Sequence, residues 1–198
     1  MLNQNFVYLA ILIDAIGTYS YFIDTVKGRI RPNKVSFALW SLAPLIAFFA
    51  EMNQGVGIQS LMTLSVGFFP FIIFLGSFVN KKAYWEIKKF DVFCGVISLV
   101  GLFLWYITQV GNWAIFFSIL ADGFAYIPTF RKAYQFPETE SAWPWLAYAL
   151  TGLVTIATIN DFNFANLGYP AYIFLSNLLV YLVVQFQLGK RKLFVIID

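Results

Sequence analysis

Seven apolar stretches, separated by short polar connections, constrain the fold of this chain more than any other feature of its sequence. Each stretch is close to the ~17–25 residues that an α-helix needs to cross the hydrocarbon core of a bilayer. They lie at roughly 5–25, 35–50, 57–79, 91–108, 112–130, 142–158 and 167–187. Of the 198 residues, 60% are hydrophobic and only 12% are charged, which is outside the range of soluble globular domains. We therefore expect an all-α integral membrane protein with seven transmembrane helices.

The thirteen Lys and Arg residues fall only in alternate connections and in the C-terminal tail. They are Lys27, Arg29, Arg31, Lys34, Lys81, Lys82, Lys88, Lys89, Arg131, Lys132, Lys190, Arg191 and Lys192. Short loops that are rich in Lys and Arg remain on the cytoplasmic side of a membrane. The pattern predicts an N-terminus outside, a cytoplasmic C-terminus and a basic tail at 190–198. It also accounts for the net charge of +3 without a nucleic-acid partner.

Residues that bind metals or form disulfides are nearly absent from the sequence. Cys94 is the single cysteine and there is no histidine, so no internal disulfide and no multi-cysteine metal site is expected. Met1 to Phe6 lacks the basic segment that begins a cleaved signal peptide, and the first apolar stretch is expected to remain as a helix. No soluble domain and no cofactor is predicted.

The second half of the chain repeats parts of the first half. An offset of 105 residues pairs Tyr21 with Tyr126, Lys27 with Lys132, Pro32 with Pro137, Ser36 with Ser141 and Trp40 with Trp145. An offset of 100 residues pairs Pro70, Ile73, Phe74 and Leu75 with Pro170, Ile173, Phe174 and Leu175. Apolar helices also resemble one another by chance, but matched Pro, Ser and Trp residues favour a true repeat. We predict a first three-helix repeat at 1–80, a loop and linker helix at 81–110, and a second repeat at 111–189.

The two repeats are expected to have the same orientation across the membrane. The matched connections at 27–34 and 131–140 are both basic and are therefore both predicted to face the cytoplasm. Two directly fused units of three helices would instead be inverted relative to each other. The linker helix at 91–108 restores the parallel orientation, with a pseudo-two-fold axis along the membrane normal.

One segment of the second repeat resembles the motif of a known family. The run Tyr126-Ile-Pro128-Thr129-Phe130-Arg-Lys132, followed by Pro137, Ser141 and Trp145, resembles the motif of the PQ-loop and SWEET/SemiSWEET transporter superfamily. The resemblance implies tandem three-helix bundles that transport a small solute by alternating access. The first repeat departs from the motif, because Ile23 stands at the position equivalent to Pro128. Similar folds occur in nicotinamide riboside transporters, amino-acid exporters and the KDEL receptor, so a sugar, a vitamin or an amino-acid-like substrate remains open.

Prolines are the predicted hinge or gate residues. In the family that the chain resembles, prolines in the first two helices of each repeat bend during alternating access, which points to Pro44, Pro128 and Pro144. A proline removes one backbone hydrogen bond from a helix and disrupts the preceding turn. A static kink is the alternative for each of them.

Two carboxylates are predicted near the middle of the membrane. Asp14 lies in the first helix and Asp122 in the fifth, where an ionised carboxylate costs about 2.5–3.5 kcal/mol. We interpret both as candidates for proton coupling, or for recognition of a cationic or hydroxyl-bearing solute. The alternative is a structural hydrogen bond, from Thr18 to Asp14 and from Ser118 or Tyr126 to Asp122.

Four further residues are predicted to bind substrate. Trp40 and Trp145 are deep enough to stack on a ring or to close a gate, although interfacial anchoring is the alternative. Ser77 and Asn177 occupy matched positions in the third and seventh helices. An asparagine pair binds sugar at these positions in SWEET proteins, so the resemblance implies cavity lining. Hydrogen bonds between helices are the alternative.

The predicted function is therefore small-solute transport, with a membrane receptor that binds but does not translocate its ligand as the alternative. The expected partners are a small-molecule substrate and the lipid bilayer. An enzyme is not expected, because no nucleophile with a base and no metal-binding cluster is evident. Glu138 and Glu140 share the cytoplasmic side with Arg131 and Lys132, and we favour surface pairing over a gate salt bridge for them.

Overall fold

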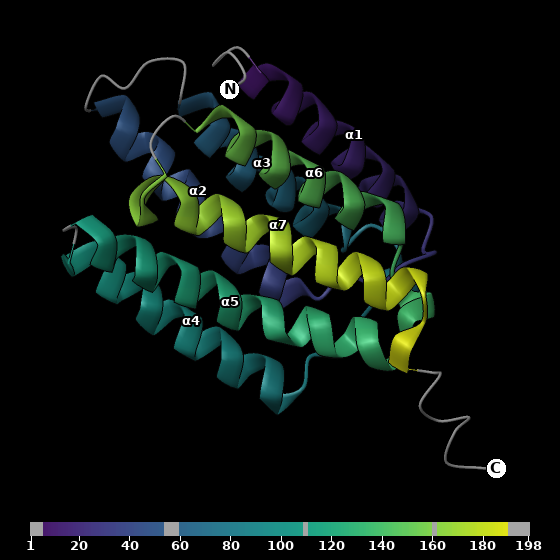
Figure 1. Cartoon of the computed structure of the whole chain (residues 1–198). Coiled ribbons are helices and arrows are strands. Elements are labelled where there is room, and N and C mark those ends of the chain that lie inside the picture. The colour runs from purple at the N-terminus through teal and green to yellow at the C-terminus, as the bar shows by residue number, and fades with distance from the viewer. Residues whose placement is uncertain (1–5, 54–59, 109–110, 160–161, 190–198) are drawn as a thin grey trace.

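Seven α-helices make up nearly all of the computed structural model, which describes residues 6–53, 60–108, 111–159 and 162–189. The helices are α1 (Phe6–Val26), α2 (Lys34–Asn53), α3 (Ser60–Gly76), α4 (Lys89–Thr108), α5 (Gly111–Gln135), α6 (Ala142–Thr158) and α7 (Phe164–Gln185), shown in Figure 1. Two short 3-10 turns, η1 (Lys81–Ala83) and η2 (Pro137–Thr139), precede α4 and α6. The described residues contain no strand, which confirms the predicted all-α fold.

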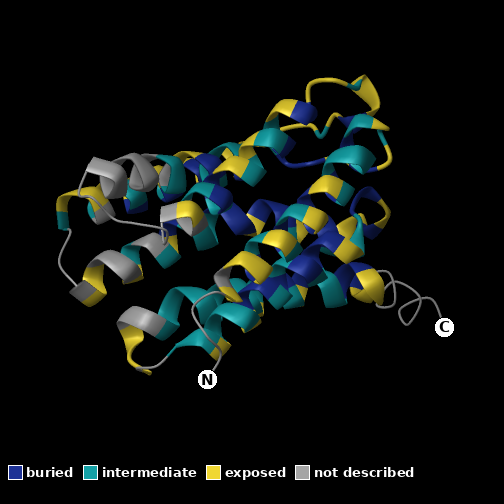
Figure 2. Cartoon of the chain, turned by 90° about the horizontal axis from the view of Figure 1, so that it is seen from above, coloured by how far each residue is buried: buried dark blue, intermediate teal, exposed yellow. Residues whose placement is uncertain are grey.

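Within the described residues, three helices are long and apolar enough to cross a membrane. The segments that meet both criteria are Tyr8–Val26 in α1, Lys89–Thr108 in α4 and Leu167–Gln185 in α7, and Leu64–Gly76 in α3 is a shorter apolar helix. The outer face of α4 is exposed and apolar at Val92, Phe93, Val96, Leu99, Val100, Phe103, Tyr106 and Ile107. Figure 2 shows the buried residues between the helices and the exposed residues on their outer faces. An exposed apolar band of this extent is typical of a surface that contacts lipid.

The helices pack in two groups of three, with α4 beside one of them. In the first group α3 contacts both α1 and α2, and in the second α7 contacts both α5 and α6. The groups meet where α1 packs against α6 and where α2 packs against α5, while α4 lies along α5 and also touches α2. The α1–α6 contact is close, since a Cβ added at Gly17 would lie 2.7 Å from the Cβ of Ala147. Small residues allow such close packing between helices.

The described Lys and Arg residues all lie at one end of the bundle. They occupy the α1–α2 connection, the start of α2, the α3–α4 connection, the start of α4 and the last turns of α5. Helix α5 continues to Gln135, beyond the predicted end near residue 130, and therefore carries Arg131 and Lys132 on helical backbone. The basic residues at 190–192 lie outside the described residues.

Two connections at this end are joined by Asn80. Its side-chain amide donates to the carbonyl of Val26 at 2.9 Å, and its side-chain oxygen accepts from the backbone N–H of Lys82. Gly28 turns the α1–α2 connection with φ of +70°, a conformation that glycine adopts without strain. A Cβ at Gly28 would also lie 2.9 Å from the Asn80 amide nitrogen, so the turn has no room for a larger residue.

Candidate functional site

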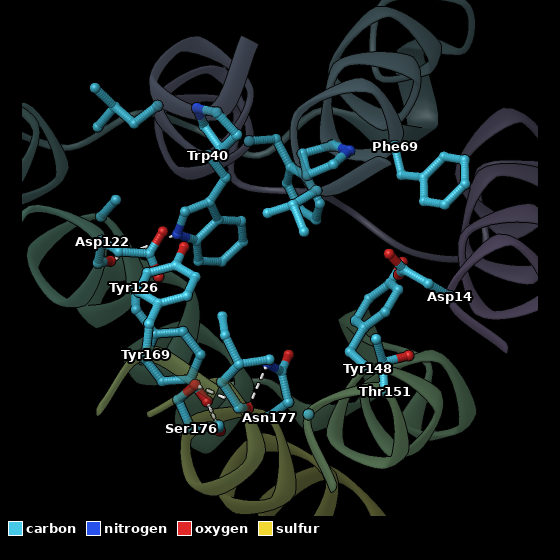
Figure 3. A pocket seen from close by; sticks show the side chains of 18 of the residues that line it. Asp14, Trp40, Phe69, Asp122, Tyr126, Tyr148, Thr151, Tyr169, Ser176 and Asn177 are labelled. Carbon is cyan, nitrogen blue, oxygen red and sulfur yellow. Dashed lines mark hydrogen bonds between the residues drawn. The ribbon is translucent and has the colours of Figure 1, made fainter. Parts of the chain in front are cut away.

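A cavity of about 450 Å³ lies between the two groups of helices. This volume falls within the about 300–1,000 Å³ that is usual for small-molecule sites. All seven helices contribute to its lining, and Figure 3 shows the side chains that surround it. The polar and aromatic lining residues are Asp14, Thr18, Phe37, Trp40, Phe69, Ser98, Asp122, Tyr126, Trp145, Tyr148, Thr151, Thr155, Tyr169, Ser176 and Asn177.

Aromatic rings from both groups of helices form one wall of the cavity. The rings of Trp40 and Trp145 are 6.2 Å apart at an interplanar angle of 74°. Tyr126 lies 6.0 Å from Trp40 and 6.5 Å from Trp145, in a perpendicular arrangement with the second. Edge-to-face packing of this kind stabilises aromatic clusters. Both predicted tryptophans therefore face the cavity, with Trp145 fully buried at 2% exposure.

The two predicted carboxylates line opposite sides of the cavity. Asp14 lies on α1 beside Tyr148, and Asp122 lies on α5 beside Tyr126 and Tyr169 (Figure 3). The Tyr172 hydroxyl interacts electrostatically with Asp122, but it makes no hydrogen bond of good geometry in the described part of the chain. Both carboxyl groups are thus brought to one space by helices from different groups.

Two of the hydroxyl groups that could have formed structural hydrogen bonds with these carboxylates bond to other groups instead. Thr18 pairs with the hydroxyl of Tyr148 at 3.3 Å rather than with Asp14. Tyr126 donates to the backbone carbonyl of Ser176 rather than to Asp122. The side chain of Ser118 lies outside the described residues. Trp40 does contact Asp122, but through an indole N–H that donates to its backbone carbonyl at 3.5 Å.

Asn177 lines the cavity, whereas Ser77 does not. The Asn177 amide donates to the carbonyl of Ile173 at 2.8 Å. Ser77 is 2% exposed, and its hydroxyl donates to the carbonyl of Phe74 at 2.6 Å in the last turn of α3. Ser77 is therefore turned onto its own backbone and is absent from the lining, contrary to the predicted binding role. Ser176, which sequence reasoning missed, lies at the cavity on the turn that carries Asn177.

The three predicted hinge or gate prolines lie in different settings. Pro44 lies inside α2 and lines the cavity, and Pro128 is buried inside α5 away from the lining. Pro144 is the third residue of α6, in a first turn whose backbone N–H groups have no helical partner. It therefore breaks no helical hydrogen bond, and its role as a hinge or gate stays a prediction. Two prolines that were aligned in the repeat but given no role, Pro70 in α3 and Pro170 in α7, both line the cavity.

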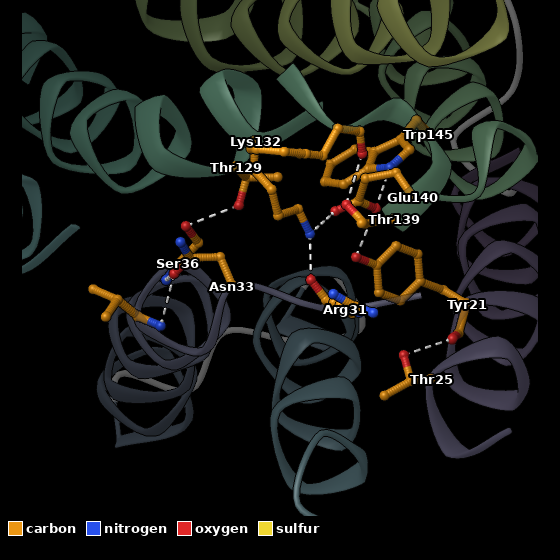
Figure 4. A network of polar contacts seen from close by, with 12 residues as sticks. Tyr21, Thr25, Arg31, Asn33, Ser36, Thr129, Lys132, Thr139, Glu140 and Trp145 are labelled. Carbon is orange, nitrogen blue, oxygen red and sulfur yellow. Dashed lines mark hydrogen bonds and ion pairs between the residues drawn. The ribbon is translucent and has the colours of Figure 1, made fainter. Parts of the chain in front are cut away.

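A buried ion pair lies next to the cavity at the basic end of the bundle. Lys132 on α5 pairs with Glu140, and both side chains are inaccessible to solvent. Lys132 also donates to the carbonyl of Arg31, in the connection between α1 and α2 (Figure 4). Glu140 accepts from the Tyr21 hydroxyl at 2.8 Å and from the Trp145 indole N–H at 3.2 Å. Surface pairing, the interpretation favoured from sequence, is therefore wrong for these two residues.

Further hydrogen bonds at this end join α2 to α5 and the α1–α2 connection to η2. Thr129 donates to the hydroxyl of Ser36 at 2.9 Å, and Ser36 donates to the carbonyl of Ala125 at 2.5 Å. The backbone N–H of Arg31 donates to the carbonyl of Thr139 at 2.9 Å. We call Tyr21, Arg31, Lys132, Glu140 and Trp145 the basic-end network. It ties the first group of helices to the second through buried polar contacts.

Comparison with known proteins identifies no relative. No family model matches the chain, and neither a curated protein nor a solved structure matches it. The resemblance to the PQ-loop and SWEET superfamily accordingly rests on the sequence motif and stays a prediction.

Proposed function

We propose that this protein is a small-solute transporter that works by alternating access, with its substrate held between the two groups of helices. The observation that carries the proposal is a cavity with tryptophans from both groups in its wall, directly beside a buried network that joins the groups. A site between two bodies that move relative to each other is the common plan of secondary transporters.

The aromatic geometry supports an internal repeat. Tyr21 lies 6.0 Å from Trp145, and Tyr126 lies 6.0 Å from Trp40. These four residues are the two pairs that the 105-residue offset aligns, so each pair of rings is the counterpart of the other. We infer two parallel three-helix repeats, α1–α3 and α5–α7, with α4 as the linker and seven membrane-spanning helices. In each repeat the third helix contacts both the first and the second, as symmetry requires.

The basic-end network is the closed cytoplasmic gate in this proposal. The positive-inside rule puts the basic end in the cytoplasm, with the N-terminus outside. Lys132 and Glu140 belong to the second repeat, and their partners Arg31 and Tyr21 belong to the first. Opening toward the cytoplasm must separate these partners, so the network holds the protein closed on that side.

Asp122 and Asp14 are the candidates for proton coupling. A carboxyl group that gains and loses a proton as the cavity changes sides links solute movement to a proton gradient. Both carboxyl groups line the cavity, which supplies the access that this role requires.

Reconstitution tests the proposal. The full chain in liposomes should accumulate or exchange a solute that binds it, and Trp40→Ala should reduce this flux while the protein still folds. Exchange of a labelled ligand across the liposome membrane supports transport. Saturable binding without flux, under gradients of either direction, would leave a membrane receptor of the same fold instead.

A further inference from the structure

We propose that the cavity selects a small organic cation that carries no anionic group, such as an aliphatic diamine or a quaternary ammonium ion. This inference rests on the proposed function, because it names the class of solute that the transport site takes. The charged side chains of the cavity are the first reason. The described lining contains two carboxylic acids, Asp14 and Asp122, and no Lys or Arg.

Asp14 is a buried carboxyl group that makes no hydrogen bond and no ion pair with any of the described residues. It is 8% exposed. The side chain points into the cavity, with Tyr148 and Thr151 beside it (Figure 3). Burying a charged group is costly unless it is paired. A cationic ligand in the cavity supplies the missing partner.

The surrounding rings suit a cation as well. Trp40, Tyr126 and Tyr169 lie near Asp122, whereas Phe69 and Tyr148 lie on the side of Asp14 (Figure 3). Ammonium groups bind to the faces of Trp, Tyr and Phe rings through cation–π attraction. Each carboxylate is therefore accompanied by aromatic rings, so the cavity offers two places for positive charge on opposite walls.

The described lining of the cavity has no cationic side chain that could pair with a carboxylate or phosphate on the ligand. Lys132, a buried cation at the basic end, is already paired with Glu140 and donates to the carbonyl of Arg31. A zwitterionic amino acid would bring its carboxylate into a space already lined by two acids. Like charges in a desolvated site are unfavourable, so the site discriminates against such ligands.

A neutral sugar is also disfavoured, because most of the described hydrogen-bond donors of the cavity already bond to other groups of the protein. Thr18 and Tyr148 bond each other, and Thr151 donates to the carbonyls of Ala147 and Ala10. The Tyr126 hydroxyl and the Asn177 amide likewise donate to backbone carbonyls. What the cavity mainly offers to a ligand is acceptor capacity and aromatic surface, which is the complement of an ammonium group.

Binding of matched probes to the purified full-length protein tests the inference. The panel is 1,5-diaminopentane, L-lysine, 1,5-pentanediol, tetramethylammonium and glucose, measured by titration calorimetry. L-Lysine differs from 1,5-diaminopentane only by its carboxylate, and 1,5-pentanediol has a similar shape without charge. We expect the diamine or tetramethylammonium to bind at least about tenfold more tightly than L-lysine, glucose or the diol.

Variants locate the binding to the cavity. Asp14→Asn and Asp122→Asn should each weaken binding of the preferred cation by about tenfold or more, because each removes one negative charge. Asp24→Asn is the matched control, since Asp24 lies on the same helix as Asp14 but pairs with the exposed Arg29 at 3.2 Å. The probe series on the unaltered protein stands on its own if a variant does not fold.

The outcomes separate the ligand class from transport. Equal or tighter binding of L-lysine, glucose or the diol overturns the cation proposal, as does a failure of both cations to bind. Flux of a neutral solute without cation binding would retain transport and reject the ligand class. Selective cation binding without flux in liposomes would retain the ligand class and reject transport.

Discussion

The indole N–H of Trp145 donates to Glu140 at 3.2 Å, while the same ring forms part of the cavity wall. One side chain thus belongs both to the candidate ligand site and to the basic-end network. A ligand that displaces the indole changes the surroundings of the Lys132–Glu140 pair directly. In the proposed transport cycle, this contact would link occupancy of the cavity to closure of the basic end.

Replacing one member of the buried Lys132–Glu140 pair should destabilise the fold more than replacing both members together. Removing one partner leaves an uncompensated buried charge, so Glu140→Gln is expected to lower the free energy of unfolding by about 3–5 kcal/mol. Glu140→Gln combined with Lys132→Met should recover part of this loss, since no charge then remains buried. Thermal unfolding of the purified variants measures both effects. Equal stability of Glu140→Gln and the unaltered protein contradicts the burial of this pair.

Loss of the Lys132–Glu140 pair should also make the proposed gate at the basic end open more easily. In the double variant, a cysteine introduced at Thr139, which is buried at 8% exposure, should react faster with a thiol reagent from the basic end. The matched control is a cysteine at the exposed Gln135, whose reaction rate should not change. An unchanged rate at Thr139 would show that the network does not hold the gate closed.

Topology can be tested with single cysteines after replacement of Cys94 by alanine. A cysteine at Asn163 should react with an impermeant thiol reagent from outside the cell, and a cysteine at Gln135 only after the membrane is opened. The expectation follows from the basic connections, which are retained in the cytoplasm. The reverse labelling would overturn the orientation, and reaction of both positions from one side would overturn the helix count.

Trp145 and Asn177 are expected to contribute to ligand binding. Trp145→Ala removes a large aromatic surface and Asn177→Ala removes a polar group, so each should weaken binding by about 1–3 kcal/mol. Calorimetric titration with the tightest probe gives the two values. Ser77→Ala is the matched control, since its hydroxyl bonds to its own helix and lies outside the cavity lining. Unchanged affinity in both cavity variants would remove this site.

Asp122→Asn tests proton coupling. The amide mimics a permanently protonated carboxyl, so accumulation driven by a pH gradient should be lost while counterflow exchange continues. For a cationic solute the exchange must be measured at a concentration that saturates the weaker binding of the variant. Proteoliposomes with an imposed pH gradient provide the measurement. Full gradient-driven accumulation by the variant would exclude coupling through Asp122 and leave Asp14, or transport without protons.

Sequence reasoning predicted the elements better than their contacts. The apolar stretches predicted seven helices, and each overlaps one of the seven helices among the described residues. Trp40, Trp145, Asp14, Asp122, Asn177 and Pro44 were singled out individually and all line one cavity. Ser77 shows the limit of this reasoning. The direction of the Ser77 hydroxyl, which bonds to the carbonyl of Phe74, depends on local backbone geometry that a one-dimensional pattern does not resolve.

Apolar composition and the spacing of basic residues by themselves determined that this chain is helical and where its helices lie. A helix satisfies its backbone hydrogen bonds within one segment, so the local sequence is sufficient to predict where a helix forms. Only the tertiary structure decided that Glu140 is buried against Lys132, Trp145 and Tyr21. The Tyr21–Glu140 hydrogen bond joins residues 119 positions apart, and its formation depends on how α1 packs against α6. Burial and pairing of charges are properties of packed surfaces, and those surfaces exist only once distant helices have come together.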